Sequence, residues 1–74
     1  MISNHMFITL TNASPAFRGQ PVAIDSKVIV SVFRNTVTRE DNTIDDITFV
    51  FAPPHGTWEV IETVEEIVLM LNKT

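Results

Sequence analysis

The chain contains no cysteine among its 74 residues. Neither disulfides nor thiolate zinc sites can therefore stabilise the fold, although small domains often depend on one or the other. A domain of this length buries only about 60% of the surface that its unfolded chain exposes, so its stability is marginal. We expect one small domain that needs almost every large apolar side chain for its core, in a reducing cytoplasmic compartment.

Basic residues and long apolar runs are also scarce. The five Lys and Arg residues are scattered, and nine acidic residues bring the formal net charge to -4. Proteins that bind duplex nucleic acid normally carry a basic stripe that displaces phosphate counterions, and this sequence has none. No apolar run approaches the roughly 18 residues of a membrane span, and the N-terminus lacks the features of a signal peptide. We expect a soluble protein without a membrane span, for which nucleic acid is not the favoured partner.

Catalytic motifs are missing too. The chain has no nucleophile elbow, glycine-rich phosphate loop, cysteine nucleophile or HExxH motif. Asn35 to Asp46 is rich in carboxylates but lacks the ligand spacing of a calcium loop, so we interpret it as a solvated, mobile hairpin tip. The sequence predicts a protein that is not an enzyme, with no catalytic, cofactor-binding or metal-binding residues and no cofactor.

Apolar periodicity predicts about five β-strands. In the segment from Met6 to Thr11, alternation puts Met6, Ile8 and Leu10 on one face and Phe7, Thr9 and Thr11 on the other, which is typical of a half-buried strand. Val28 to Phe33 and Ile47 to Ala52 are almost continuously apolar, as expected for central strands that are covered on both faces. A short strand at 21–25 and an alternating one at 57–61 complete the set.

The last part of the chain changes to a helical period. Thr63 and Glu66 have the spacing of a capping box, which marks a helix start. Val64, Ile67, Val68 and Leu71 then recur on one face, and we expect this face to pack on the sheet because so short a helix is not stable alone.

These patterns predict a β-rich α+β fold of about five antiparallel strands, in a bent sheet or small barrel, with one C-terminal helix at 64–72. We expect a single domain at 6–74 that follows a flexible leader at 1–5. The predicted core consists of Ile8, Leu10, Val28, Val30, Val32, Phe49, Phe51, Val60, Ile67 and Leu71.

The segment Pro53 to Gly56 separates two predicted strands and is interpreted as a tight turn, because proline breaks the ladder and glycine permits positive φ. His55 in this turn has no histidine partner except His5 in the leader, so a metal site is not predicted. Trp58, just after the turn, is expected to pack in the core or at an interface.

Some apolar groups exceed what one short helix can cover. Leu69 and Met70 lie off the predicted buried stripe of the helix, and the central strands are apolar on both faces. A contiguous apolar surface of this kind is more often an interface than a bare surface. We therefore predict an interface that includes Trp58, Leu69 and Met70, formed with another copy in a symmetric oligomer or with a different protein.

The order of these segments resembles the small flagellar-operon FlbD family, also called SwrD. The resemblance covers most of the chain and is clearest at Ile24-Asp25-Ser26-Lys27-Val28 and Thr63-Val64-Glu65-Glu66-Ile67. The chain differs in its longer first loop, Ala13 to Gln20, in the acidic insertion, and in Pro-Pro-His-Gly where the family has Asn-Gly. The resemblance implies a small non-enzymatic accessory protein and supplies no catalytic residues.

Two functions are therefore considered. The favoured one is a small interaction or accessory protein that self-associates or docks on a larger protein assembly, in a setting such as a phage or mobile element. The alternative is a small-barrel nucleic-acid-binding regulator in which Phe7, Phe33 or Trp58 would stack on bases. The absence of a basic groove favours the first.

Overall fold

The computed structural model describes residues 6–73, and within them the predicted β-rich α+β fold class is confirmed. The elements are β1 (Phe7–Thr11), β2 (Pro21–Asp25), the 3-10 helix η1 (Ser26–Val28), β3 (Ser31–Thr38), β4 (Ile44–Phe51), β5 (Thr57–Val60) and α1 (Val64–Asn72). The predicted leader at 1–5 lies outside the described residues.

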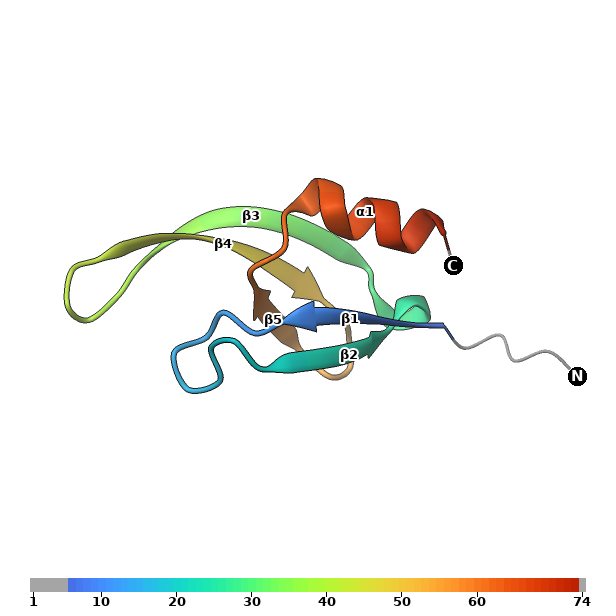
Figure 1. Ribbon diagram of the computed structural model, residues 1–74, viewed down its shortest axis with the longest axis horizontal. Coiled ribbons are helices and arrows are strands. Elements are labelled where there is room, and N and C mark those ends of the chain that lie inside the picture. The colour runs from blue at the N-terminus through green and yellow to red at the C-terminus, as the bar shows by residue number, and fades with distance from the viewer. Residues whose placement is uncertain (1–5, 74) are drawn as a thin grey trace, which may run out of the picture.

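The five strands form two antiparallel sheets that meet at one corner (Figure 1). β1 pairs with β2, and β4 lies between β3 and β5. An antiparallel bridge between Asn12 and Val60 joins the end of β1 to the end of β5. On either side of it, the Ala13 N–H donates to the Glu59 carbonyl at 2.9 Å and the Ile61 N–H to the Thr11 carbonyl at 3.0 Å. The strands therefore follow the order β2-β1-β5-β4-β3 around one strongly bent surface.

Two side-chain contacts fix the chain between β5 and α1. The Glu62 carboxylate accepts hydrogen bonds from the Thr11 N–H and the Thr11 hydroxyl, both at 2.9 Å. Directly afterwards, the predicted capping box is present: Thr63 Oγ1 accepts from the Glu66 N–H at 3.1 Å, and Glu66 Oε1 accepts from the Thr63 N–H at 2.9 Å. These bonds satisfy orphan N–H groups at the helix start, so α1 begins where the sequence places it.

The core lies inside the bend, where both sheets and α1 meet. Its buried cluster consists of Ile8, Leu10, Ile24, Val50, Ala52, Val60 and Ile67. Of the other predicted core residues, Val28, Val32 and Leu71 are partly buried and pack against this cluster. Three predictions were wrong, because Val30 is 67% exposed, Phe51 is 39% exposed, and Phe49, although partly buried, does not belong to this cluster or pack against it. Val30 lies in the link between η1 and β3, and Phe51 lies on the face of β4 that points away from Val50.

The buried face of α1 also differs from the predicted stripe. Ile67 is fully buried and Val64 is partly buried, as expected. Met70 is partly buried and packs against the core cluster, whereas Val68 is 42% exposed. Met70 is three positions after Ile67, so it lies on the same side of the helix. The expectation that Met70 has no place within the fold was therefore wrong.

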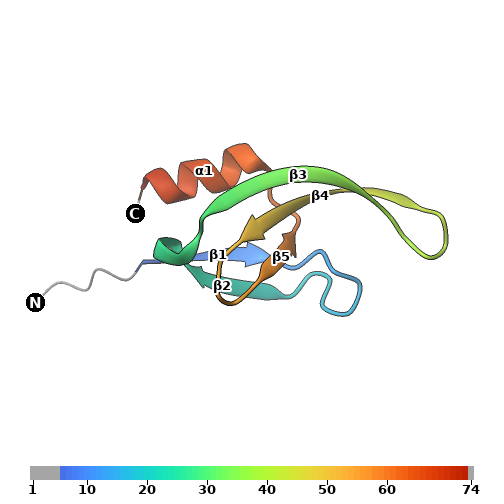
Figure 2. The ribbon, with the colours of Figure 1, turned by 180° about the vertical axis from the view of Figure 1, so that it is seen from behind.

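The long β3–β4 hairpin extends past the rest of the fold (Figures 1 and 2). Asn35 to Asp46 was predicted as a mobile hairpin tip, but most of it is strand, because β3 continues to Thr38 and β4 begins at Ile44. The misplaced boundary has a local cause, because the β-branched run Thr36-Val37-Thr38 favours strand despite the charges that follow it. Only the link between the two strands, 39–43, forms the turn.

Two valines test the corrected core. Val50 is fully buried whereas Val30 is 67% exposed, so truncation to alanine should destabilise the fold at Val50 and have little effect at Val30. We expect Val50→Ala to lower the free energy of unfolding by about 2 to 3 kcal/mol through lost burial and a residual cavity. Val30→Ala should change it by less than about 0.5 kcal/mol. Urea unfolding of both variants measures the difference, and equal losses would contradict this assignment of the core.

Candidate interaction surface

The register of β3, β4 and β5 divides their side chains between two faces. Val50 lies opposite Val32 on β3 and opposite Trp58 on β5, and all three contribute to the core side. Because directly opposed residues share a face and neighbours along a strand alternate, Phe33, Phe49 and Phe51 lie on the outer side. We call these three phenylalanines the aromatic face.

The aromatic face is only partly covered. The Phe33 and Phe49 rings are stacked, with centroids 5.4 Å apart and 12° between their planes. Phe33 is nevertheless 45% exposed and Phe51 is 39% exposed, while Phe49 is partly buried. The stacking holds the pair in a fixed arrangement that presents ring surface to solvent.

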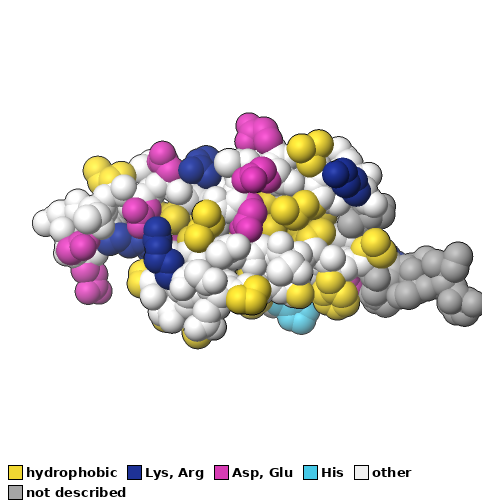
Figure 3. All heavy atoms as spheres, in the orientation of Figure 1, with side chains coloured by type: hydrophobic (Ala, Val, Ile, Leu, Met, Phe, Trp, Pro, Cys, Tyr) yellow, Lys and Arg dark blue, Asp and Glu magenta, His cyan; other side chains and the backbone are white. Residues whose placement is uncertain are grey.

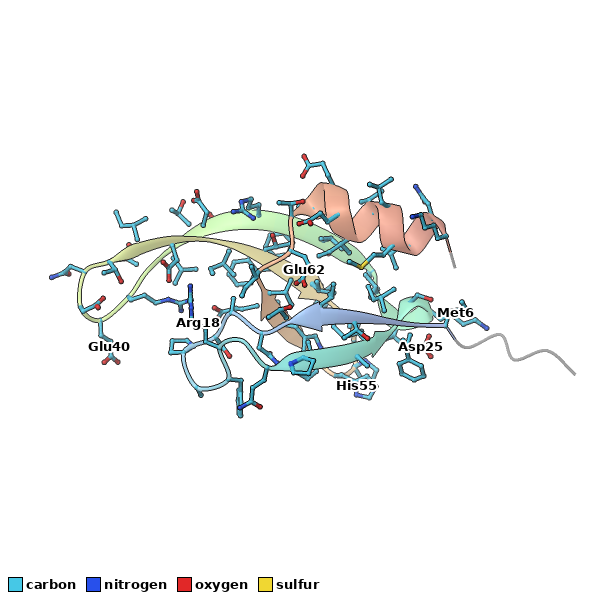
Figure 4. The ribbon with its side chains drawn as sticks, in the orientation of Figure 1. Met6, Arg18, Asp25, Glu40, His55 and Glu62 are labelled. Atoms are coloured by element: carbon cyan, nitrogen blue, oxygen red, sulfur yellow. The ribbon has the colours of Figure 1, made fainter. Side chains whose placement is uncertain are left out.

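The first loop reaches the outer side beside the aromatic face. Ile47 shares the side of β4 that carries Phe49, yet it is only 3% exposed, and Ala13 is fully buried. The loop is held there by the bond between the Ala13 N–H and the Glu59 carbonyl. The Arg18 side chain points toward the β3–β4 hairpin (Figure 4), where Nη1 lies 3.9 Å from Asp45 Oδ2. The first loop is thus attached to β5 through Ala13 and to the β3–β4 hairpin through Arg18.

A pair of carboxylates and one guanidinium mark the boundary of the aromatic face. Arg39 Nη2 lies 3.0 Å from Glu59 Oε1, and Arg39 Nε lies 3.2 Å from Asp45 Oδ2. Hydrogen bonds to Glu59 and then to Asp45 raise the pKa of Arg39 above its ordinary value. The cluster joins the hairpin turn to β5 and leaves the charges beside the aromatic face paired within the chain.

The predicted interface residues are not gathered on this face. Leu69, on α1, is 60% exposed and remains a surface residue. Trp58 and Met70 are partly buried and pack against the core cluster. Trp58 also lines a shallow hollow with Phe7 and the exposed His55, the last of which is labelled in Figure 4. Leu69 and Met70 thus lie on α1 and Trp58 on β5, and none of the three belongs to the aromatic face.

The sequence did indicate that a second apolar sheet face would remain, but it did not locate it. Phe49 and Phe51 were assigned to the core, although their i, i+2 spacing placed them on one side of a strand together. The missing information was which side the helix covers. That side is set by the corner between β1 and β5, which connects residues far apart in the chain.

The surface carries no concentrated positive charge among the described residues. On the side drawn in Figure 3, Lys and Arg side chains near the β3–β4 hairpin have Asp and Glu side chains beside them. Within residues 6–73, no group of three or more His, Cys, Asp or Glu side chains is placed to hold a metal ion. In the same part of the chain, no helix has the length and apolar content to cross a membrane. Comparison of the chain with protein-family models, curated proteins and solved structures found no match.

The hairpin turn is stabilised by a carboxylate. Asp41 Oδ1 accepts hydrogen bonds from the Thr43 hydroxyl at 2.6 Å and from the Thr43 N–H at 3.1 Å. Asn42 between them has a φ of 68°, a left-handed conformation that asparagine tolerates. The two bonds, the hydroxyl first, lower the pKa of Asp41.

We expect Thr43→Val to raise the pKa of Asp41 toward its ordinary value, because the variant loses the hydroxyl donor and keeps the backbone donor. The ionised Asp41 carboxylate adds to the free energy of unfolding at pH values above its unfolded pKa, near 3.8. This contribution is lost as the pH falls through the lower pKa of the folded state. NMR titration of the Asp41 carboxyl carbon in both proteins measures the change. An unchanged pKa in the variant would show that the hydroxyl does not stabilise the carboxylate.

Proposed function

We propose that this protein is a small non-enzymatic interaction protein that self-associates through its aromatic face. The supporting observation is that Phe33 and Phe51, on the same side of one rigid sheet, each leave more than a third of their surface in solvent. A phenylalanine buries about 150 to 250 Å² when fully enclosed, so each leaves roughly 60 to 110 Å² uncovered. At about 25 cal/mol per Å², covering each ring contributes about 2 kcal/mol.

A second copy of this chain is the occupant that the charges favour. Arg39 pairs with both Asp45 and Glu59 at the boundary of the aromatic face, and Arg18 lies 3.9 Å from Asp45. Two cations therefore balance two carboxylates, and this boundary offers no net charge for an acidic or basic partner to match. A second copy presents the same neutral apolar surface, as a two-fold symmetric interface requires. Sheets packed in this way lie about 10 Å apart, with their side chains interdigitated.

The wider role follows from the size and composition of the chain. An oligomer of so small a domain is suited to an accessory role on a larger protein assembly, which is also what the resemblance to the FlbD family implies. The absence of cysteine supports a reducing cytoplasmic compartment. A phage or mobile-element setting is part of the same proposal.

Nucleic-acid binding receives less support. Of the aromatic residues proposed to stack on bases, Trp58 packs against the core cluster. Stacking platforms ordinarily lie in a positive groove. Arg34, however, lies on the other side of β3 from the exposed Phe33, and both Arg34 and Arg39 donate hydrogen bonds within the chain.

The double variant Phe33→Ser, Phe51→Ser tests the proposed interface. We expect the weight-average mass of the unmodified chain to rise with concentration to at least twice its 8.3 kDa, and the double variant to associate about tenfold or more weakly. Phe17→Ser is the matched control, because Phe17 is 57% exposed but lies in the first loop, outside the aromatic face. Sedimentation equilibrium measures all three.

Two results would overturn this proposal. One is a monomeric unmodified chain throughout the concentration range. The other is an equal loss of association in the double variant and in Phe17→Ser. Circular dichroism spectra identify any variant that has lost its fold, in which case Phe51→Ser alone replaces the double variant.

A further inference from the structure

β3 is an outer strand with one side of its backbone unpaired. Within the described residues it hydrogen-bonds only to β4, and it is eight residues long. The half of β3 next to the hairpin turn extends past α1 in both ribbon views (Figures 1 and 2). A strand of this length at the edge of a sheet is a template for pairing with another strand.

The register shows which backbone groups point away from β4. The Arg39 N–H donates to the Thr43 carbonyl at 2.8 Å, so Arg39 and Thr43 are a hydrogen-bonded pair. Hydrogen-bonded and non-hydrogen-bonded pairs alternate in an antiparallel ladder, so the N–H and C=O groups of Arg34 and Thr36 face outward. An independent contact agrees with this: the Thr36 N–H donates to Asn35 Oδ1 at 2.9 Å.

This edge has few of the devices that prevent pairing. β3 contains no proline, and its one charged residue is Arg34. The Arg34 guanidinium is turned back over its own sheet, where Nη1 donates to Thr48 Oγ1 at 2.9 Å and Nη2 to the Asp46 carbonyl at 3.3 Å. The Asn35 side chain accepts a hydrogen bond from the outward Thr36 N–H, and rotation of that side chain frees this donor.

We propose that β3 pairs antiparallel with β3 of a second copy, about a two-fold axis at Asn35, so that one sheet continues through both copies. This goes beyond the proposed packing of the aromatic faces, because it uses the edge of the sheet instead of its outer side. The two interfaces share Phe33 at their boundary, whereas Phe51 belongs to the aromatic face alone.

Charge selects this register. With Asn35 opposite Asn35 of the second copy, Arg34 lies opposite Thr36 of that copy, whose neighbour on β4 is Asp46. Each Arg34 then lies on the same face as a carboxylate from the other copy. Moving the axis by one residue toward the start of β3 would place the two Arg34 residues directly opposite each other, and like charges in that position destabilise a sheet.

The same register adds an apolar contact. Phe33 lies opposite Val37 of the second copy, on the side that carries the aromatic face. Opposed aromatic and β-branched side chains are a stabilising pair. Pairing therefore covers part of the exposed Phe33 ring and replaces the local Thr36–Asn35 bond by a bond between strands.

A single introduced cysteine tests the register, because the chain has none of its own. In the proposed pairing, the Cα atoms at position 35 are about 4.5 Å apart, as in other non-hydrogen-bonded pairs, and a disulfide bridges that distance. We expect Asn35→Cys to form a disulfide-linked dimer under mild oxidation at least about tenfold faster than Ala23→Cys. Ala23 is the matched control, since it is exposed on β2, the outer strand at the other end of the bent surface.

Thr36→Pro provides a second, non-covalent test. The Thr36 N–H points away from β4, so proline at this edge position removes an intermolecular donor and leaves the ladder to β4 in place. We expect a melting temperature close to that of the unmodified chain at low concentration and an association weakened by about tenfold or more. Sedimentation equilibrium and thermal melting measure the two quantities.

The outcomes separate the two proposals. If Asn35→Cys forms no more dimer than Ala23→Cys, pairing through β3 is wrong, whatever the aromatic-face variants show. If Asn35→Cys forms the dimer but Phe51→Ser, which keeps the contact between Phe33 and Val37, associates like the unmodified chain, the edge pairing holds and the aromatic-face proposal fails. Should Thr36→Pro lose its β-sheet spectrum, Thr36→Lys takes its place, and undiminished association of that variant overturns the edge pairing.

Discussion

The bridge between Asn12 and Val60 is the contact on which the arrangement of the fold depends. Val60 also pairs with Thr48 across the β4–β5 ladder, so this one residue connects β4 to the end of β1. The Glu62 carboxylate secures the same corner by accepting hydrogen bonds from the N–H and the hydroxyl of Thr11. Isolated two-stranded hairpins are marginal in water, so β1 and β2 gain their stability from this attachment.

The corner also decides which apolar surface is buried. Once β1 lies beside β5, the inside of the bend contains Val50, Val60 and the side chains of β1 and β2, and α1 completes it with Ile67. A domain of this size has too few residues to build a further layer on the other side. Ile47 on that side is buried, but none of the elements within residues 6–73 covers the aromatic face, which stays partly open.

The elements of the fold were predictable because their signals are local. Alternation and apolar runs indicated five strands, although β3 begins at Ser31 and not at Val28, and the capping box at Thr63 located the helix start. The faces were less predictable where apolar residues run continuously, since Phe49 and Val50 both fit a core position and only one side of β4 is covered. The Glu62–Thr11 contact spans 51 positions, and no local pattern reports such a contact.

The sequence predicted that an apolar sheet face would stay uncovered, but it did not identify the residues of that face. An uncovered second sheet face followed from the apolar central strands. Its residues did not follow, because they depend on the side to which α1 and the first loop attach. On α1, Met70 lies on the buried side where Val68 was expected. Capping and periodicity do not determine how the helix is rotated about its axis, and packing against the sheet does.

The most direct measurement is an isotope-filtered NOE experiment on a mixture of labelled and unlabelled chains, which detects only protons of different copies. The account predicts intermolecular NOEs from the Phe33 and Phe51 rings to other side chains of the β3–β4–β5 sheet. Intermolecular NOEs confined to α1 or β2, or their absence at millimolar concentration, would contradict assembly through this sheet.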